Sequence, residues 1–535
     1  MAAVSPRVGR GVRLCHNGGM KTLSKSSERA AMAGVVLLAG LLRFWAIDAK
    51  TIWLDEAFSI WVAELPLPKL LRFVASVDHH PPLYYLLQHG WQVALGNSAF
   101  AVRSLPALLG VATVPLLYAA GRRLTDGTTA LMAALLLAVS PFHVRYGQES
   151  RMYALMTLLA AGALLCLAVW LADSRAGSVQ RRAAMGGLAV TQALLMLTHN
   201  TAALLFPAAL NAGVAGAFWM QGASAKTAGV GGTLGDKGFV LRWLAVQAAA
   251  LLLWLPWGPA FWAQAQTVYH EFWIQQPSGY SVWLAFHNFN LAFPEGWFPA
   301  APWWDLLYWG LTLGGVWALR RRRPVAVLLA AMFIVPPVLE LLAGLRRPVF
   351  SDRTLIWTTL PYYLFVAAGL RGLADGAKAT RWRTVAASAV AVLLVGLTVY
   401  SLHAYFTGYE KEDWRSAAAC VAEGARPGDL AIFHAPWVQI PFAYYYRGQG
   451  APVEMRGAPA DLFATGELEP AMRTEDLPAL RNLIAGRERV WLVYSHEWYS
   501  DAGGLVPQEI ERVMVAADEC TFLGGRVIRF ERRGG

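Results

Sequence analysis

Two adjacent carboxylates, Asp55 and Glu56, follow the first long apolar stretch of the chain, within Thr51-Ile-Trp-Leu-Asp-Glu-Ala-Phe-Ser59. At the edge of a bilayer, such a pair meets water on one side and lipid on the other, and each charge perturbs the proton affinity of its neighbour. A general base must be ionised near neutral pH and lie within hydrogen-bond reach of the hydroxyl that it activates. We therefore predict a catalytic pair. A helix N-terminus, which favours acids, is the structural alternative.

The same loop contains Asp78, His79 and His80, followed by two prolines. The prolines predict an extended entry into a helix that starts at Leu83, and free amides at such a start favour an anion, so we predict binding of a substrate phosphate. Zinc is a competing ligand, although the standard ligand spacing is missing, and a structural role is the third reading. The metal assignment is therefore unknown: no cofactor is required, and a divalent cation is an option.

Arginine gathers at two further connections. The first is His143-Val-Arg-Tyr-Gly-Gln-Glu-Ser-Arg-Met-Tyr153, with the candidates Arg145, Glu149, Arg151 and Tyr153. The second is Leu345-Arg-Arg-Pro-Val-Phe-Ser-Asp-Arg353, with the candidates Arg346, Arg347 and Arg353. Arginine suits a phosphate, and positive charge on an outer membrane face needs a compensating ligand, so both clusters are predicted to bind substrate. Snorkelling to the lipid interface is the alternative.

The composition indicates a polytopic α-helical membrane protein. Of its 535 residues, 15% are charged, against about 25% in soluble domains, and 56% are hydrophobic. Stretches long enough to cross about 30 Å of hydrocarbon predict about 11 transmembrane helices. The predicted spans lie near 31–47, 101–120, 126–142, 152–172, 184–198, 200–219, 243–262, 303–319, 324–344, 354–370 and 384–404.

Basic residues predict how the chain is oriented. They concentrate in residues 1–30 and in alternate connections, at Arg122-Arg123, Arg181-Arg182, Arg320–Arg323 and Arg371–Arg383. The positive-inside rule then makes residues 1–30 a cytoplasmic tail and places residues 405–535 outside, as expected in a bacterial inner (plasma) membrane. The net charge of +11 is thus mainly a topology signal. Because the basic groups are scattered between apolar spans, no nucleic-acid partner is expected.

The predicted organisation is a membrane domain, 31–404, with long outer loops at 48–100 and 263–302, and a small α/β domain, 405–535. Loop 48–100 includes an amphipathic stretch at 65–74, and loop 263–302 is rich in aromatic residues, typical of an interfacial belt or of a sugar-stacking wall. In the C-terminal domain we expect strands near 430–434, 489–495 and 521–530, and helices near 413–423, 437–446, 476–486 and 507–518. Tyr409–Arg415 is interpreted as a helix start, and Cys420 and Cys520 as a disulfide or two free thiols.

Three of these motifs together resemble a known family. They are Trp-Leu-Asp-Glu-Ala, His-Pro-Pro-Leu-Tyr-Tyr and Tyr-Gly-Gln-Glu-Ser-Arg-Met-Tyr-Ala. In this order they are similar to membrane glycosyltransferases of the C-type fold, and more narrowly to the family 39, protein-mannosyltransferase-like group. The chain departs from some relatives, which have a lysine or another residue before the Pro-Pro pair where this sequence has His79 and His80, so the resemblance does not assign the carrier contact or a metal at this position.

The resemblance implies transfer of a sugar from a polyprenyl phosphate to a hydroxyl of a protein, lipid or glycan, on the extracytoplasmic face and with inversion. It implies that Asp55 deprotonates the acceptor, that Glu56 orients the site, and that His80, Arg151 and Arg353 lie near the phosphate. Membrane lipids would be the remaining partner. A multi-pass transporter or flippase of lipid-linked sugars is the alternative, but it predicts charges near mid-membrane and related halves, which the sequence lacks.

Overall fold

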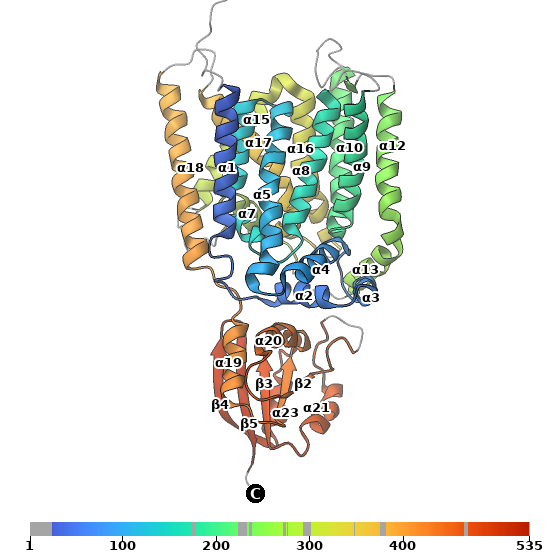
Figure 1. The fold of residues 1–535 in the computed structure, drawn as a ribbon, viewed down its shortest axis with the longest axis vertical. Helices are drawn as coiled ribbons and strands as arrows, with labels where there is room; N and C mark the ends of the chain where they lie inside the picture. The colour runs from blue at the N-terminus through green and yellow to red at the C-terminus, as the bar shows by residue number, and fades with distance from the viewer. Residues whose placement is uncertain are drawn as a thin grey trace, which may run out of the picture.

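The computed structural model describes residues 24–533, except for 173–177, 223–232, 235–237, 271–273, 275, 293–300, 347, 375–380 and 465–468. A bundle of long helices stands on a smaller domain that the last part of the chain forms from a sheet and short helices (Figure 1). Arg347, two tryptophans of the aromatic loop (273 and 297) and the first 23 residues lie outside the described residues.

Long helices make up the bundle, as the apolar stretches predict. They are α1 (Lys25–Phe44), α5 (Ala99–Leu124), α6 (Gly127–Val139), α7 (Pro141–Gly147), α8 (Tyr153–Ala172), α9 (Val179–Met196), α10 (Asn200–Gly222), α12 (Phe239–Trp254), α13 (Gly258–His270), α15 (Ala301–Ala318), α16 (Arg323–Gly344), α17 (Thr359–Ala374) and α18 (Arg381–Thr407). Short 3₁₀ turns, η1 (Leu255–Trp257), η3 (Leu319–Arg322) and η4 (Asp352–Thr358), interrupt them. Every predicted span overlaps one of these helical segments.

Six helical stretches of the described chain are long and apolar enough to cross a membrane, and a seventh if α6 and α7, bent by 56°, form one span. One of the six, Pro302–Gly344, is 43 residues long and contains both α15 and α16. The fold class is therefore confirmed, while the count of about 11 stays a prediction.

The starts of α1 and α18 lie at the end of the bundle away from the C-terminal domain (Figure 1), and both contain basic residues. There Arg122 of α5 lies 3.8 Å from Glu28 of α1, and Arg371 of α17 forms an ion pair with Asp126. Arg322 donates to the carbonyl of Leu124, 3.2 Å away. The connections that the charge pattern groups together thus share one end of the molecule.

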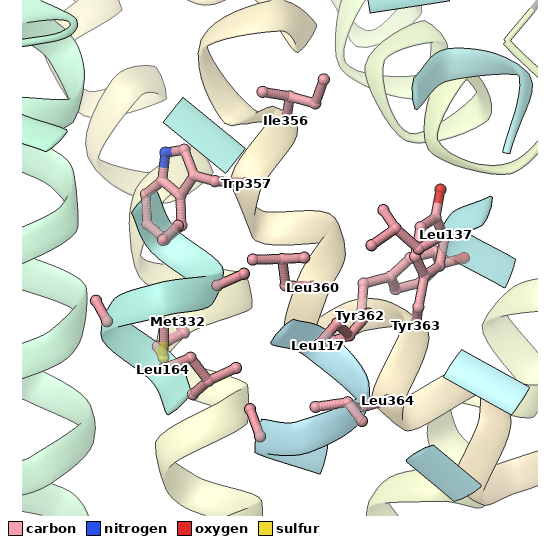
Figure 2. Packing of buried hydrophobic residues seen from close by; sticks show 14 of the residues in the cluster. Leu117, Leu137, Leu164, Met332, Ile356, Trp357, Leu360, Tyr362, Tyr363 and Leu364 are labelled. Atoms are coloured by element: carbon pink, nitrogen blue, oxygen red, sulfur yellow. The ribbon is translucent and has the colours of Figure 1, made fainter. Parts of the chain in front are cut away.

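The interior of the bundle is filled by large apolar side chains from several helices. Figure 2 shows Trp357, Leu360, Leu164 and Met332 packed around the start of α17. Behind them α15 and α17 approach so closely at Gly315 and Gly369 that a methyl group on either would overlap the facing backbone. Small residues allow such close helix packing in membranes. The helix α17 directly follows η4, which carries Arg353, so this packing lies next to the Arg353 segment.

The 48–100 loop folds into three short helices, α2 (Leu54–Glu64), α3 (Leu67–Ser76) and α4 (Leu83–Leu95), at the end of the bundle next to the C-terminal domain (Figure 1). The predicted amphipathic stretch becomes α3, which buries Leu70 and Val74 and exposes Leu67 and Leu71. A fourth short helix, α14 (Gly279–Asn290), lies in the aromatic loop.

The C-terminal domain is built on a five-stranded sheet of order β2-β1-β3-β5-β4, in which β2, β1 and β3 are parallel and β5 and β4 antiparallel. The strands are β1 (Leu430–His434), β2 (Glu454–Gly457), β3 (Arg489–Tyr494), β4 (Met514–Phe522) and β5 (Gly525–Arg532). The helical elements are α19 (Trp414–Gly424), η5 (Pro436–Val438), α20 (Gln439–Tyr446), η6 (Thr474–Asp476), α21 (Leu477–Ile484), α22 (Glu497–Ser500) and α23 (Leu505–Glu511). β1 and β3 are fully buried.

One predicted helix of this domain is wrong in its second half. We expected a helix near 507–518, but α23 ends at Glu511 and β4 begins at Met514. The alanines and acids of Met514–Glu519 suit a helix in isolation. Pairing with β5 at the edge of the sheet overrides that preference.

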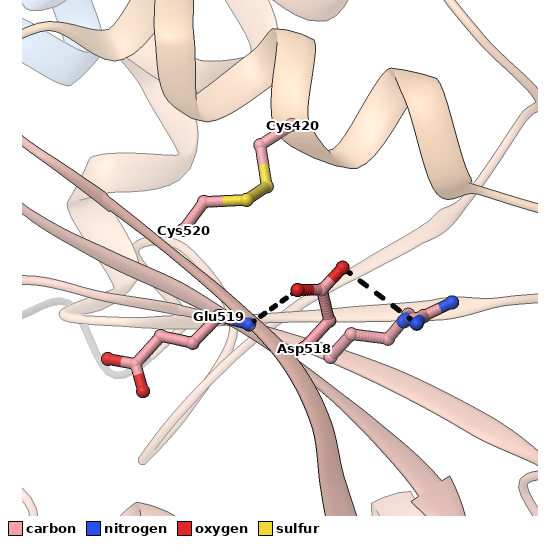
Figure 3. The surroundings of a disulfide bond; sticks show 5 residues. Cys420, Asp518, Glu519 and Cys520 are labelled. Atoms are coloured by element: carbon pink, nitrogen blue, oxygen red, sulfur yellow. Dashed lines mark hydrogen bonds and ion pairs between the residues drawn. A yellow bond between two sulfur atoms is a disulfide. The ribbon is translucent and has the colours of Figure 1, made fainter.

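A disulfide joins Cys420 of α19 to Cys520 of β4 (Figure 3). The sequence left a disulfide or two free thiols as alternatives, and the structure contains the disulfide. The remaining described cysteine, Cys166 of α8, is a half-buried free thiol. The bridge closes a separation of 100 residues, so it ties the first helix of the domain to one of its last strands.

Replacing both bridged cysteines by serine should lower the free energy of unfolding of the C-terminal domain by about 2–5 kcal/mol, because a long loop is no longer constrained in the unfolded state. Pulse proteolysis of the full-length protein in a urea series measures this as a lower midpoint for cleavage of the domain. Cys166→Ser is the matched control and should leave the midpoint in place. Equal midpoints for the double variant and the wild type would contradict the expected stabilisation.

Candidate active site

Asp55 lies in the first turn of α2 and contacts arginines from two distant segments. Arg353 Nη1 donates to Asp55 Oδ2 over 3.0 Å, and Arg151 Nε lies 3.9 Å from the same oxygen. Arg151 Nη1 also donates to the Asp55 carbonyl (3.3 Å) and to Ser59 Oγ (3.2 Å). A quarter of the Asp55 side chain stays exposed. The carboxylate is therefore held by two guanidinium groups and is still accessible.

The charges around Asp55 keep it ionised. Burial alone would raise the pKa of the Asp55 carboxyl, but Arg151, Arg353 and His80 outweigh burial, and the pKa lies below its ordinary value. His80 thus acts on the same carboxylate from a third segment. The structure brings together these four residues, all predicted from separate motifs.

Glu56 has a different environment, although it is the next residue. It is fully buried, and Arg103 donates to both of its carboxylate oxygens over 2.7 Å. Lys411 Nζ (2.8 Å) and the Ser150 amide (2.9 Å) complete its partners. Arg103 and Lys411 hold the pKa of Glu56 well below its usual range against the effect of burial. Because each oxygen is already bonded, the geometry gives Glu56 an orienting role.

Arg103 and Lys411 were not among the residues predicted from the sequence. Arg103 lies inside a predicted span, where one charge in an apolar helix is the detectable signal. Lys411 lies in Tyr409–Arg415, which was interpreted as a helix start. That interpretation is correct for Asp413, which caps α19 by accepting from the Ser416 amide. Lys411, by contrast, is buried beside Glu56.

The Asp78–His80 segment is held by its own hydrogen bonds and lies against the bend between α9 and α10. Asp78 Oδ1 accepts from the His79 amide (2.7 Å) and from His80 Nδ1 (3.3 Å), and the ring of His80 lies 5.0 Å from that of His199. The Leu83 amide, however, donates to the Leu197 carbonyl. The first amide of α4 is therefore occupied, which differs from the free helix start that we predicted as an anion site.

The bend between α9 and α10, Thr198–Asn200, supports this segment. Asn200 donates to the His79 carbonyl over 2.9 Å and to Gln264 over 2.8 Å. The sequence showed this bend only as a weak point between two predicted spans, and His199 was not predicted. Within the described residues, no group of three or more His, Cys, Asp or Glu side chains could hold a metal ion.

The third cluster places a guanidinium between two aromatic rings. Arg145 of α7 lies 5.1 Å from the ring of Tyr146 and 4.8 Å from that of Tyr409, with about a fifth of its side chain exposed. Glu149 is buried, and its Oε2 lies 3.9 Å from Arg145 Nε. Tyr153 lies under Arg353, 5.9 Å from its guanidinium carbon. This cluster is thus continuous with the site around Asp55.

Neighbouring acids fix the Arg353 loop. Asp352 accepts from the Arg353 amide (2.7 Å) and from Asn288 of α14 (2.7 Å). Glu340 of α16, itself buried, accepts from Thr354 over 2.6 Å. Arg346 is exposed, and no contact with Asp55 is seen, so the structure does not bring this candidate into the cluster. Arg347 lies outside the described residues.

This arrangement can perform one kind of chemistry. An accessible carboxylate can accept a proton, and the guanidinium groups of Arg151 and Arg353 beside it carry charge that suits a phosphate. Arg145 belongs to the neighbouring cluster, where the buried Glu149 lies close to it. The arrangement therefore combines a proton acceptor with cations that can bind a leaving phosphate.

Comparison with known proteins shows which family model matches part of the chain and which solved structures share its fold. Residues 79–257 match the family model of dolichyl-phosphate-mannose-protein mannosyltransferases. No curated protein matches the chain. The matched segment contains His80 and Arg151, and the fold of the chain is the C-type glycosyltransferase fold that the three motifs predict.

Solved structures establish that fold. The chain is similar to ArnT from Cupriavidus metallidurans in the apo state, with a TM-score of 0.59 and 13% identity over 94% of this chain and 98% of that one. ArnT bound to undecaprenyl phosphate gives 0.57 and 14%, over 95% and 98%. The oligosaccharyltransferase of Archaeoglobus fulgidus gives 0.61 and 14%, over 94% of this chain and 74% of that one.

Arg353→Gln should move the acid limb of the pH profile of kcat/KM to higher pH. A base with a lowered pKa works above that pKa and loses activity as pH falls through it. Removing Arg353 takes away a cation and a hydrogen bond that lower the pKa of Asp55, so that pKa rises. Glycosyl transfer measured across acid pH tests this. Arg346→Gln, at the exposed arginine, is the control, and an unshifted limb in Arg353→Gln would contradict the assignment.

Proposed function

We propose that the protein transfers a sugar from a polyprenyl phosphate to an acceptor hydroxyl, on the extracytoplasmic face, by a single inverting displacement with Asp55 as the base. The observation that carries the proposal is the contact of one accessible carboxylate with Arg353 and Arg151. It joins a proton acceptor to the two groups best suited to a phosphate. Undecaprenyl phosphate in the similar ArnT structure supports this class of donor.

In the proposed reaction, the acceptor oxygen attacks the anomeric carbon while Asp55 Oδ takes its proton. The bond from that carbon to the phosphate oxygen breaks, and its electron pair leaves with the polyprenyl phosphate. Arg151 and Arg353, with Arg145 beside them, neutralise the charge that grows on this oxygen. The acceptor oxygen attacks the anomeric carbon from the side opposite to the leaving phosphate, so the anomeric configuration inverts.

The same guanidinium groups serve Asp55 and the phosphate, which couples donor binding to the strength of the base. Arg353 and Arg151 lower the pKa of Asp55. A donor phosphate competes for both arginines, so its binding raises the pKa of Asp55 towards the value that a general base needs. Proton transfer from the acceptor then follows donor binding.

The proposed orientation rests on charge and on the disulfide. The basic end of the bundle would face the cytoplasm under the positive-inside rule. The site and the C-terminal domain are at the opposite end (Figure 1). A disulfide in that domain suits an oxidising compartment. These observations support the proposal of an extracytoplasmic site, and a bacterial inner membrane stays a prediction from the sequence.

Asp55→Asn should abolish transfer, by about 10²-fold or more, because an amide cannot take the proton. The assay uses purified protein with a polyprenyl-phosphate sugar, and undecaprenyl phosphate binding is measured on the same sample. Binding should persist, since the arginines remain. Asp48→Asn, at an exposed carboxylate, is the control. Normal turnover by Asp55→Asn would remove Asp55 as the base.

The donor sugar and the acceptor can be identified by an experiment on cells. Comparing lipid-linked sugars and surface glycans by mass spectrometry, in a deletion strain and its parent, identifies both. The proposal expects one lipid-linked sugar to accumulate while one glycan modification disappears. A deletion strain with unchanged profiles in both fractions would count against the proposed function.

A further inference from the structure

Lys411 is buried in the connection between the last bundle helix, α18, and the C-terminal domain. Only 2% of its side chain is exposed. Its ammonium lies 2.8 Å from Glu56 Oε2 and 3.5 Å from Glu149 Oε2. A lysine is almost never fully buried unless it is paired. This one lies between two carboxylates from different parts of the membrane domain.

Glu149 depends on that ammonium. Its side chain is 1% exposed. In the described part of the chain, neither of its carboxylate oxygens accepts a hydrogen bond. Within 4 Å, the described cations beside it are Lys411 and Arg145. A buried carboxylate needs a compensating charge. If Lys411 did not supply it, Arg145 would have to.

The negative charges of Glu56 and Glu149 are then balanced without Arg145. Glu56 and Glu149 are compensated by Arg103 and Lys411. Arg145 can therefore direct its guanidinium to a phosphate. Without Lys411, attraction to Glu149 would turn Arg145 away from the donor site.

The backbone around Lys411 is bonded to the chain that leads into the base. Lys50 donates to the Tyr409 carbonyl (2.6 Å), and Thr51 donates to the Glu412 carbonyl (2.8 Å). The Leu54 amide donates to the Glu412 carboxylate (3.4 Å). The segment 409–412 thus runs beside 50–54, directly before Asp55.

We propose that Lys411 is a positioning residue: by neutralising Glu149 and bonding Glu56, it keeps Arg145 directed to the donor phosphate and fixes the segment that holds Asp55. The C-terminal connection is then a part of the active site. This inference rests on the proposed function, because it assigns Arg145 to the donor phosphate.

Lys411→Met should weaken binding of undecaprenyl phosphate about tenfold or more, as expected when one partner of a buried charge pair is removed. Binding is measured by titration calorimetry on the full-length protein in detergent micelles. Lys69→Met, the same change at an exposed lysine of α3, is the matched control and should bind like the wild type. Equal affinity of Lys411→Met and the control would overturn the inference.

The double variant Lys411→Met/Glu149→Gln separates charge balance from a loss of packing. It removes the ammonium together with the carboxylate that needs it, so undecaprenyl phosphate affinity should return to within about threefold of the wild type. If Lys411 only filled space, the second substitution would restore nothing, and that outcome also overturns the inference. Thermal melting should follow the same order, lowered in Lys411→Met and recovered in the double variant.

Failure of the proposed function is distinguishable from failure of this inference. Wild-type protein that binds undecaprenyl phosphate but transfers no polyprenyl-linked sugar overturns the function, while rescue of binding and melting by Glu149→Gln still supports the charge balance. Active wild-type protein without rescue overturns the positioning role alone. If Lys411→Met does not fold, the double variant still gives both readouts, and a misfolded double variant counts against charge balance.

Discussion

The ion pair between Glu56 and Arg103 is the contact on which the active site depends. Arg103 makes five hydrogen bonds, two to Glu56 and three to the carbonyls of Ile47, Lys50 and Thr51. These use all five N–H donors of a guanidinium. One side chain of α5 therefore fixes both the start of α2 and the chain before it. A lysine could not replace it, since it lacks the planar fork.

Because Arg103 fixes Glu56, the two neighbouring carboxylates differ in burial and in hydrogen bonding. Glu56 points into the protein, where each oxygen is bonded and no substrate can reach it. Asp55 is then turned towards Arg151, which is buried, and Arg353, which is partly buried. Burial and hydrogen bonding give the two acids different roles. Glu56 holds the geometry, and Asp55 remains accessible for the proposed proton exchange. Two equally exposed carboxylates would have no fixed geometry, and each negative charge would raise the pKa of the other.

Much of the site could be predicted because charge at a membrane edge is costly and therefore noticeable. Asp55, His80, Arg151 and Arg353 came from separate motifs, and the structure brings them together. Arg346 belongs to the same arginine-rich motif as Arg353 but is exposed, since sequence proximity does not determine which side chain turns inward. The bundle helices followed from apolar length alone.

The partners of Glu56 could not be predicted in the same way. Arg103 resembles an isolated charge in a span, and Lys411 lies 355 positions from the acid that it contacts. A single sequence contains no signal for a pairing over that distance. The strand β4 was missed for a related reason: its local preference is helical, and only pairing with β5 decides its conformation. Long-range contacts decided each of these differences.

The distance between Glu56 and Lys411 along the chain also sets the order in which the contacts of Glu56 form during synthesis. A chain is made from its N-terminus, so α2 and its acids are in place long before the connection after α18 emerges. Until then, the acid next to the base lacks one of its two cations. The proposed active site is consequently completed last, by a residue that follows every helix of the bundle. A chain that ended before Lys411 would leave Glu56 paired with Arg103 but without its second cation.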